Sequence, residues 1–172
     1  DTEHLTGETD TTATANPKTY TGFAFDESVE DTVASGNIAG DGSLVLKLYY
    51  TRNSYEVSYA YTGTVPADAS ALPEKAAVKY GASVTVAEAA TAKGHTFSGW
   101  STGDFTMPAQ DVEITGSFTA NGDTAYTVEH YQQNLAGDGY DLVEADTEHL
   151  TGETDTTATA NPKAYTGFTF DG

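Results

Sequence analysis

The sequence contains no cysteine, one methionine, one tryptophan and few basic residues. The absence of cysteine excludes disulfide bonds, thiol catalysis and zinc sites with thiolate ligands. Only 7 Lys and Arg residues accompany 26 acidic residues, which gives a formal net charge of −19. Nucleic acids and anionic membrane surfaces are bound through basic patches, so we expect neither as a partner.

Long apolar runs are also missing. No stretch approaches the roughly 20 apolar residues of a membrane-spanning helix, so we expect no membrane insertion by this chain. Helical periodicity is scarce, and turn residues recur about every ten positions, which is typical of β-rich chains. The hydrophobic fraction is 38%, with 11 Tyr and 7 Phe, which is enough to build packed cores. We therefore predict a β-rich fold, either mainly β or small α+β.

One stretch of 27 residues occurs twice, as an N-terminal copy at 1–27 and a C-terminal copy at 146–172. The aligned positions that differ are Thr19/Ala164, Ala24/Thr169 and Glu27/Gly172. Self-similarity at a fixed period, here 145 residues from Asp1 to Asp146, is the signature of a tandem array. We infer that the chain belongs to an array in which two kinds of small module alternate.

Short polar joints at 51–54 and 120–123 predict the limits of the modules. We place a partial module at 1–52, a whole module at 53–123 and a second partial module at 124–172. A module of about 70 residues is only marginally stable when whole. Half a module is therefore expected to depend on neighbouring modules of the array, or on neighbouring molecules that complete it.

Period-two alternation predicts most of the secondary structure. The predicted strands are Tyr20–Phe25, Leu44–Tyr50, Tyr55–Tyr61, two short strands within 76–86 around a turn at Gly81, Thr96–Trp100, Val112–Phe118, Tyr126–His130 and Tyr140–Ala145. Short helical turns are predicted at Ser28–Val33 and Ala87–Ala92. The segment 6–17 is predicted to be a loop or an edge strand.

Three motifs of the central module are typical of one family of repeats. They are Val78–Gly81, Gly94–Trp100, and Met107–Ala109 followed by the Asp111–Phe118 strand. On these motifs, residues 55–120 resemble the Listeria–Bacteroides repeat, also called the internalin-type B-repeat. His95 stands where tyrosine is usual in that family.

The partial modules carry a second resemblance. Tyr126–Tyr131, Tyr165–Phe168 and Leu46–Tyr50 are similar to segments of the mucin-binding-protein-type repeats, which places that resemblance on 124–172 and 1–52. Both families are β-grasp-like modules strung in linear arrays on secreted or wall-anchored bacterial surface proteins. The resemblances imply a structural stalk of an extracellular adhesin, anchored in a Gram-positive cell wall. They leave open multivalent binding of mucin or host glycans, and self-assembly into an extracellular filament.

We expect no enzyme and no cofactor, because small repeated modules have no room for a deep pocket. No catalytic residue is therefore predicted. The four histidines, His4, His95, His130 and His149, lack a second ligand at metal-binding spacing, so no metal site is expected. Asp41 and Asp138 lie in Ala-Gly-Asp-Gly turns without the spacing of a calcium loop, which favours plain hairpin turns.

Two residues are candidates for more specific roles. Trp100 could stack on a sugar, although a large aromatic in a small module is more often needed inside the core. Lys47 could form an isopeptide bond, as lysines of related surface stalks do with Asn or Asp side chains. Alternation places Lys47 on the strand face opposite Leu46 and Leu48, which favours a solvated lysine.

Overall fold

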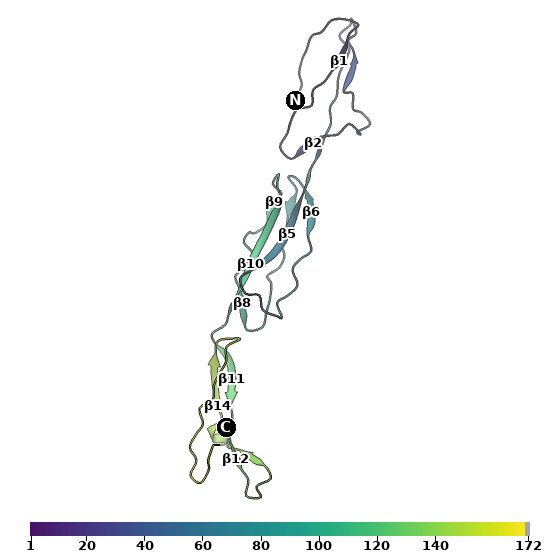
Figure 1. Ribbon diagram of the computed structural model, residues 1–172. Helices are drawn as coiled ribbons and strands as arrows, with labels where there is room; N and C mark the ends of the chain where they lie inside the picture. Colours follow the sequence, from purple (N-terminus) through teal and green to yellow (C-terminus); the bar gives the residue numbers. More distant parts are fainter. Residues whose placement is uncertain (171–172) are drawn as a thin grey trace. The chain divides into compact units, whose positions relative to one another are not determined.

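The computed structural model describes residues 1–170, which form a β-rich chain of short strands (Figure 1). No α-helix occurs among these residues, and one 3-10 helix, η1, spans Glu144–Asp146. The predicted β-rich class is therefore confirmed, while the β-grasp-like arrangement of each module stays a prediction. The strands are β1 Thr12–Thr14, β2 Phe23–Phe25, β3 Ser35–Asn37, β4 Tyr50–Arg52, β5 Ser54–Thr62, β6 Ala76–Lys79, β7 Ser83–Val84, β8 His95–Phe97, β9 Phe105–Thr106, β10 Val112–Ala120, β11 Thr124–Val128, β12 Tyr131–Gln133, β13 Tyr140–Leu142 and β14 Glu148–Gly152.

The chain divides into two compact units. Unit 1 comprises Asp1–Ala60, Pro73–Ala87 and Trp100–Ile114, and unit 2 comprises Tyr61–Leu72, Glu88–Gly99 and Thr115–Gly172. The long strands β5 and β10 contribute residues to both units and belong to a four-stranded sheet of order β6-β5-β10-β8. The module limits predicted at 52/53 and 123/124 remain a prediction.

Unit 1 contains the main apolar core. Its buried side chains are Val57, Val84, Met107 and Ile114, and Met107 and Ile114 are fully buried. They come from β5, β7, β10 and the residue after β9, because alternation points one face of each strand inward. The partly buried aromatic residues Tyr55, Tyr59, Trp100 and Phe105 pack around this cluster.

The N-terminal part of unit 1 contains two antiparallel strand pairs, β1 with β3 and β2 with β4. Aromatic side chains hold the second pair together. The ring of Tyr50 lies 4.8 Å from that of Tyr20 and 5.8 Å from that of Phe25. This part of the chain is therefore organised by ring contacts between the repeat and the strand that follows it.

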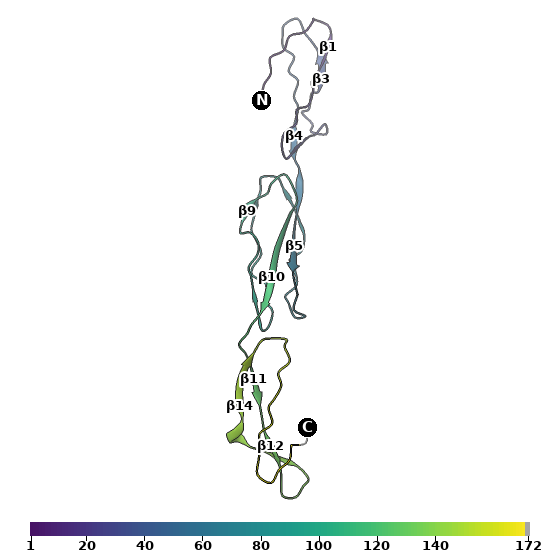
Figure 2. The same ribbon diagram turned by 60° about the vertical axis from the view of Figure 1, so that its left-hand side comes forward.

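Unit 2 combines one pair of the larger sheet with two separate hairpin-like pairs. Strand β8 pairs with β10, with Phe97 opposite Phe118. Strand β11 pairs with β14 from Thr124–Gly152 to Val128–Glu148, and the two strands lie side by side in Figure 2. Strand β12 pairs with β13 across the turn at 134–139, where Asn134 donates to Asp138 Oδ1 at 3.0 Å.

Three sequence-based assignments are wrong. The segment Leu44–Tyr50 is not a continuous strand, because its only ladder contact before β4 is an isolated bridge between Lys47 and Val33. Its alternation is nevertheless correct, with the leucines half-buried and Lys47 exposed. The segments Ser28–Val33 and Ala87–Ala92 form turns and irregular backbone in place of helical turns, since neither is long enough to stabilise a helix.

The remaining predicted strands are present, although several are shorter than the alternating pattern. The turn at Gly81 between β6 and β7 is confirmed by the Ala82 N–H, which donates to the carbonyl oxygen of Lys79 at 3.0 Å. The predicted strand Thr96–Trp100 is represented by β8, which begins at His95 and ends at Phe97.

Candidate functional site

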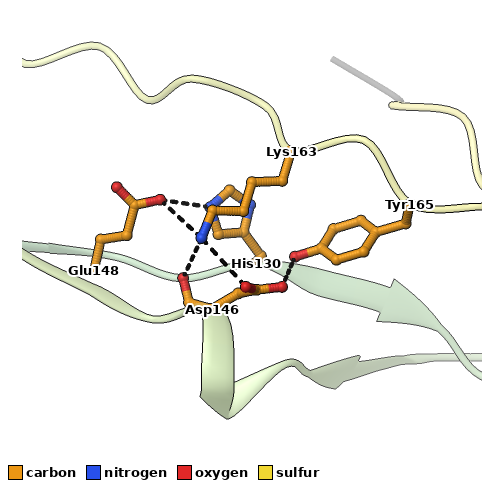
Figure 3. Close-up of polar contacts among 5 residues, drawn as sticks. All are labelled: His130, Asp146, Glu148, Lys163 and Tyr165. Carbon is orange, nitrogen blue, oxygen red and sulfur yellow. Dashed lines mark hydrogen bonds and ion pairs between the residues drawn. The ribbon is translucent and has the colours of Figure 1, made fainter.

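The densest group of interacting charges in the described chain surrounds Lys163 (Figure 3). The Lys163 Nζ lies 3.3 Å from Asp146 Oδ1 and 3.2 Å from Glu148 Oε1. The Tyr165 hydroxyl donates to Asp146 Oδ2 at 2.7 Å, and His130 Nε2 lies 3.4 Å from Glu148 Oε1. We call these five residues the lysine cluster. It ties the strand-free segment after β14 back onto η1 and β14.

The N-terminal copy builds the same core of the cluster from identical residues. Lys18 Nζ lies 2.5 Å from Asp1 Oδ2 and 2.7 Å from Glu3 Oε1. The remaining neighbours differ, because Tyr20 packs on Tyr50 and the Lys18 N–H donates to the Tyr50 hydroxyl at 2.8 Å. The two acids and the lysine thus form a unit that the repeat sequence assembles in two different surroundings.

The electrostatics of the lysine cluster favour fully charged partners. The hydrogen bond from Tyr165, followed by the contact with Lys163, lowers the pKa of Asp146. Hydrogen bonds from Lys163 and then His130 lower the pKa of Glu148. The hydrogen bond to Glu148 is the largest influence that raises the pKa of Lys163. The cluster therefore stabilises carboxylates and an ammonium ion.

This charge state decides what the cluster can do chemically. Formation of an isopeptide bond needs an uncharged amine and a protonated carboxyl group, and the pKa of Lys163 is raised while that of Asp146 is lowered. The group is also open to solvent, since both side chains are about one-third exposed. The geometry is that of a structural clamp.

Stability of unit 2 is expected to depend on pH through this clamp. Lowered carboxyl pKa values give a contribution that is present above the ordinary values of 3.8 and 4.5 and is lost as the pH falls through the lowered ones. The raised pKa of Lys163 gives one that is present below 10.5 and lost as the pH rises through the raised value. Lys163→Met should therefore destabilise unit 2 near neutral pH and have little effect in strong acid, measured by thermal unfolding from pH 2 to 8.

The matched control is Lys93→Met, which removes a lysine of unit 2 outside the cluster. The difference between Lys163→Met and this control should vanish below the lowered carboxyl pKa values. A difference that stays constant across the acid range would show that the lysine stem, through packing, is what matters.

The two residues singled out from the sequence occupy structural positions. The Trp100 ring is half-buried and lies 5.0 Å from the ring of Tyr59, in an edge-on contact against the core of unit 1. Lys47 is exposed, and its backbone forms both hydrogen bonds of the bridge with Val33, at 2.8 and 2.9 Å. A glycan role for Trp100 and an isopeptide role for Lys47 stay predictions.

The histidines and the paired turns are likewise placed by local contacts. His95 Nδ1 contacts the carbonyl oxygen of Lys93 at 2.9 Å, and His149 Nδ1 lies 3.4 Å from the Thr127 hydroxyl. The Asp41 carboxylate accepts the Ser43 N–H at 3.0 Å within its turn, and the Ser43 bonds lower its pKa. Among residues 1–170, no group of three or more His, Cys, Asp or Glu residues is arranged to hold a metal ion.

An open groove lies beside the lysine cluster in unit 2. Residues 129–133, Tyr140 and residues of 162–170 line it. Four of its aromatic side chains are strongly exposed, and they are Tyr131 (52%), Tyr140 (62%), Phe168 (47%) and Phe170 (70%). Exposed aromatic faces of this kind bind sugars or other chains, so the groove is the surface best suited to a ligand.

Sequence reasoning missed the lysine cluster, although a signal for it was present. The chain has only 7 basic residues, and two of them, Lys18 and Lys163, occupy equivalent positions 17 residues after Asp1 and Asp146. A scarce charge that recurs opposite acids within a repeat indicates a specific contact. The spacing alone does not show that the intervening loop returns to the acids.

Comparisons with known proteins add no assignment to this geometry. Within residues 1–170, no helix is long and apolar enough to cross a membrane. No protein-family model matches the chain, and the comparisons with curated proteins and with solved structures gave no significant match.

Proposed function

We propose that this chain is a structural spacer, formed by tandem β-rich modules in the stalk of an extracellular bacterial surface adhesin. The observation that carries the proposal is the repeat of 27 residues at a period of 145. Arrays of small modules that contact mainly their neighbours extend along one dimension as modules are added. The role of such a stalk is to hold a terminal domain away from the cell wall.

The contacts at the joint 51–54 support a spacer of limited flexibility. The Asn53 N–H donates to the carbonyl oxygen of Gly22 at 2.9 Å, and the Tyr80 N–H donates to that of Asn53 at 2.8 Å. The guanidinium group of Arg52 donates to the Tyr80 carbonyl oxygen at 2.9 Å and lies 5.0 Å from the centre of the Phe23 ring. Backbone groups bonded on both sides have few torsions free to bend.

The joint 120–123 has comparable contacts within unit 2. The Asn121 N–H donates to the carbonyl oxygen of Gly94 at 2.8 Å, and its side-chain oxygen accepts from the Thr96 hydroxyl at 2.7 Å. The Asn121 carbonyl oxygen accepts from the Thr154 N–H at 2.9 Å. The net charge of −19 adds repulsion between chains and opposes collapse.

The proposal predicts how reach grows with the number of repeats. Small-angle scattering of chains with one, two and three periods of 145 residues should give a maximum dimension that rises linearly with copy number. A flexible chain would instead grow roughly as the square root of its length. Replacement of residues 51–54 and 120–123 by Gly-Ser sequences of equal length provides the control, and it should shift the dependence toward the square root. A square-root dependence for the natural joints contradicts the proposal.

A second candidate function is weak, multivalent binding of mucin or another host glycan. The exposed aromatic residues of the groove beside the lysine cluster favour it. Retention on immobilised mucin that increases steeply with the number of repeats would support this function, because avidity multiplies weak contacts. Absence of retention at every copy number would leave the spacer function.

A further inference from the structure

The two copies of the repeat use one identical segment in different ways. Glu148–Gly152 forms strand β14 and pairs with β11, with Leu150 opposite Tyr126. The equivalent segment Glu3–Gly7 has the same sequence but belongs to no strand in the described part of the chain. Its Leu5 side chain is 84% exposed, against 38% for Leu150. The N-terminal copy therefore presents an unpaired strand whose natural partner is visible elsewhere in the same molecule.

Contacts beyond the strand pair continue this relationship. The Thr154 hydroxyl lies 2.5 Å from the Thr124 hydroxyl, and Asp155 Oδ2 lies 3.6 Å from His95 Nε2. The Thr154 backbone also bonds to Asn121. Every repeat residue in these contacts has an identical counterpart, with Thr9 for Thr154 and Asp10 for Asp155, and the three differing positions lie outside 3–10.

The N-terminal copy already holds the conformation that these contacts need. Asp10 has φ +62° and Asp155 has φ +60°, a left-handed conformation that costs a non-glycine residue about 1–2 kcal/mol. The preceding turn is also the same, because the Thr11 hydroxyl donates to the Glu8 carbonyl oxygen at 2.6 Å and the Thr156 hydroxyl donates to that of Glu153 at 2.7 Å. A segment that is preorganised in this way loses less entropy on binding.

We propose that residues 3–10 are a docking site for a second copy of this chain, which inserts its β11 beside Glu3–Gly7. The contacts of β14 would then be reproduced between molecules, with Tyr126 of one copy opposite Leu5 of the other. Because donor and acceptor are different surfaces, the association is head-to-tail and continues into open chains of molecules. The inference does not depend on the spacer function, since a chain that remains monomeric could still serve as a spacer.

Two effects set the concentration at which this association appears. The donor strand is already paired with its own β14, which competes at an effective concentration in the mM range. The net charge of −19 also separates the molecules, and salt screens that repulsion. We therefore expect association at high protein concentration and high ionic strength, and at lower concentration when β14 is weakened.

Disulfide trapping tests the predicted register, and the absence of native cysteine makes every bond assignable. Leu5→Cys combined with Tyr126→Cys should give dimers, trimers and longer species under mild oxidation. Tyr126→Cys with Leu150→Cys should close within one chain, since these residues are opposite each other in β14 and β11. His4→Cys with Tyr126→Cys should link several-fold more slowly, because a shift of one residue moves the thiol to the other face.

The source of the partner strand is checked by mixing isotope-labelled and unlabelled chains before oxidation. Mixed-label peptides that join residues 5 and 126 are the expected result. Links confined to single chains, or equal rates for the Leu5 and His4 variants, would overturn the proposal.

A matched pair of proline variants tests the same idea without cross-linking. Proline lacks the backbone N–H and disrupts a paired strand. Thr151→Pro weakens β14 and frees the donor, so sedimentation should show more association. Thr6→Pro damages the acceptor and should give less. The double variant should return to monomer, whereas association of the double variant would reveal non-specific aggregation and contradict the proposal, as would identical sedimentation of the two single variants.

Discussion

Replacement of Gly22 by alanine is expected to lower the free energy of unfolding of unit 1 by about 2–5 kcal/mol. Gly22 has φ +78°, which costs an alanine about 1–2 kcal/mol. A Cβ atom at this position would also overlap the ring of Tyr80. Overpacking of this kind adds about 1–3 kcal/mol, because the Tyr80 ring has to move.

The Tyr80 ring is held in place by the joint itself. It packs edge-on against Phe23 with the ring centres 5.8 Å apart, and the Tyr80 backbone bonds to Asn53 and Arg52. Displacement of the ring should therefore loosen the joint as well as the turn. Urea unfolding measures the loss of stability, and hydrogen exchange of the β2 and β4 amides shows where it occurs.

The repeat supplies a matched control for this substitution. Gly167 is the equivalent residue of the C-terminal copy, with φ +85°, and no atom lies within 4 Å of the position that a Cβ atom would occupy there. Gly167→Ala should therefore cost only the conformational penalty of about 1–2 kcal/mol. Equal losses for the two variants would show that contact with Tyr80 does not confine the joint.

The two copies also show which features of the fold local sequence determines. Tight turns recur in both, since the Phe23 N–H donates to Tyr20 and the Phe168 N–H donates to Tyr165, each at 3.1 Å. The acid–lysine contacts recur as well. Interactions between residues that are close along the chain, or fixed by a short loop, are therefore the predictable part of this fold.

Strands behave differently in the two copies. The sequence Thr-Ala-Thr forms β1 at Thr12–Thr14 beside β3, but the same residues at 157–159 belong to no strand. Conversely, β14 at Glu148–Gly152 has no counterpart at 3–7. Strand formation requires a partner to satisfy backbone hydrogen bonds, so the sequence of one segment cannot determine it. The same reason explains why Leu44–Tyr50 has correct alternation without being a strand.

The core of unit 1 was more accessible to sequence reasoning than the lysine cluster of unit 2. The alternation of Val112, Ile114 and Phe118 correctly placed Ile114 on the inward face of β10. The lysine cluster depends on where a loop returns, and neither periodicity nor spacing specifies that. Apolar patterning thus predicted the packed strands, while the polar contacts at the joints required the three-dimensional arrangement.

The second large effect is expected at Ile114, which is fully buried among Val57, Val84 and Met107. Ile114→Ala should lower the free energy of unfolding by about 2–5 kcal/mol, because it removes buried methyl groups and leaves a cavity. The loss is large relative to the stability of a small domain, which is typically about 5–15 kcal/mol. Fluorescence of Trp100, the single tryptophan, reports the transition because its ring packs against this core.

The control for this experiment is Leu135→Ala, at a leucine that is fully exposed in the turn between β12 and β13. Its effect should stay within about 0.5 kcal/mol. In the Ile114→Ala variant, the amides of β11 and β14 should keep their protection from hydrogen exchange, since modules of an array unfold semi-independently. Simultaneous loss of protection in β14 and in the core of unit 1 would show a single cooperative body, and the description of the chain as a string of separate modules would then be wrong.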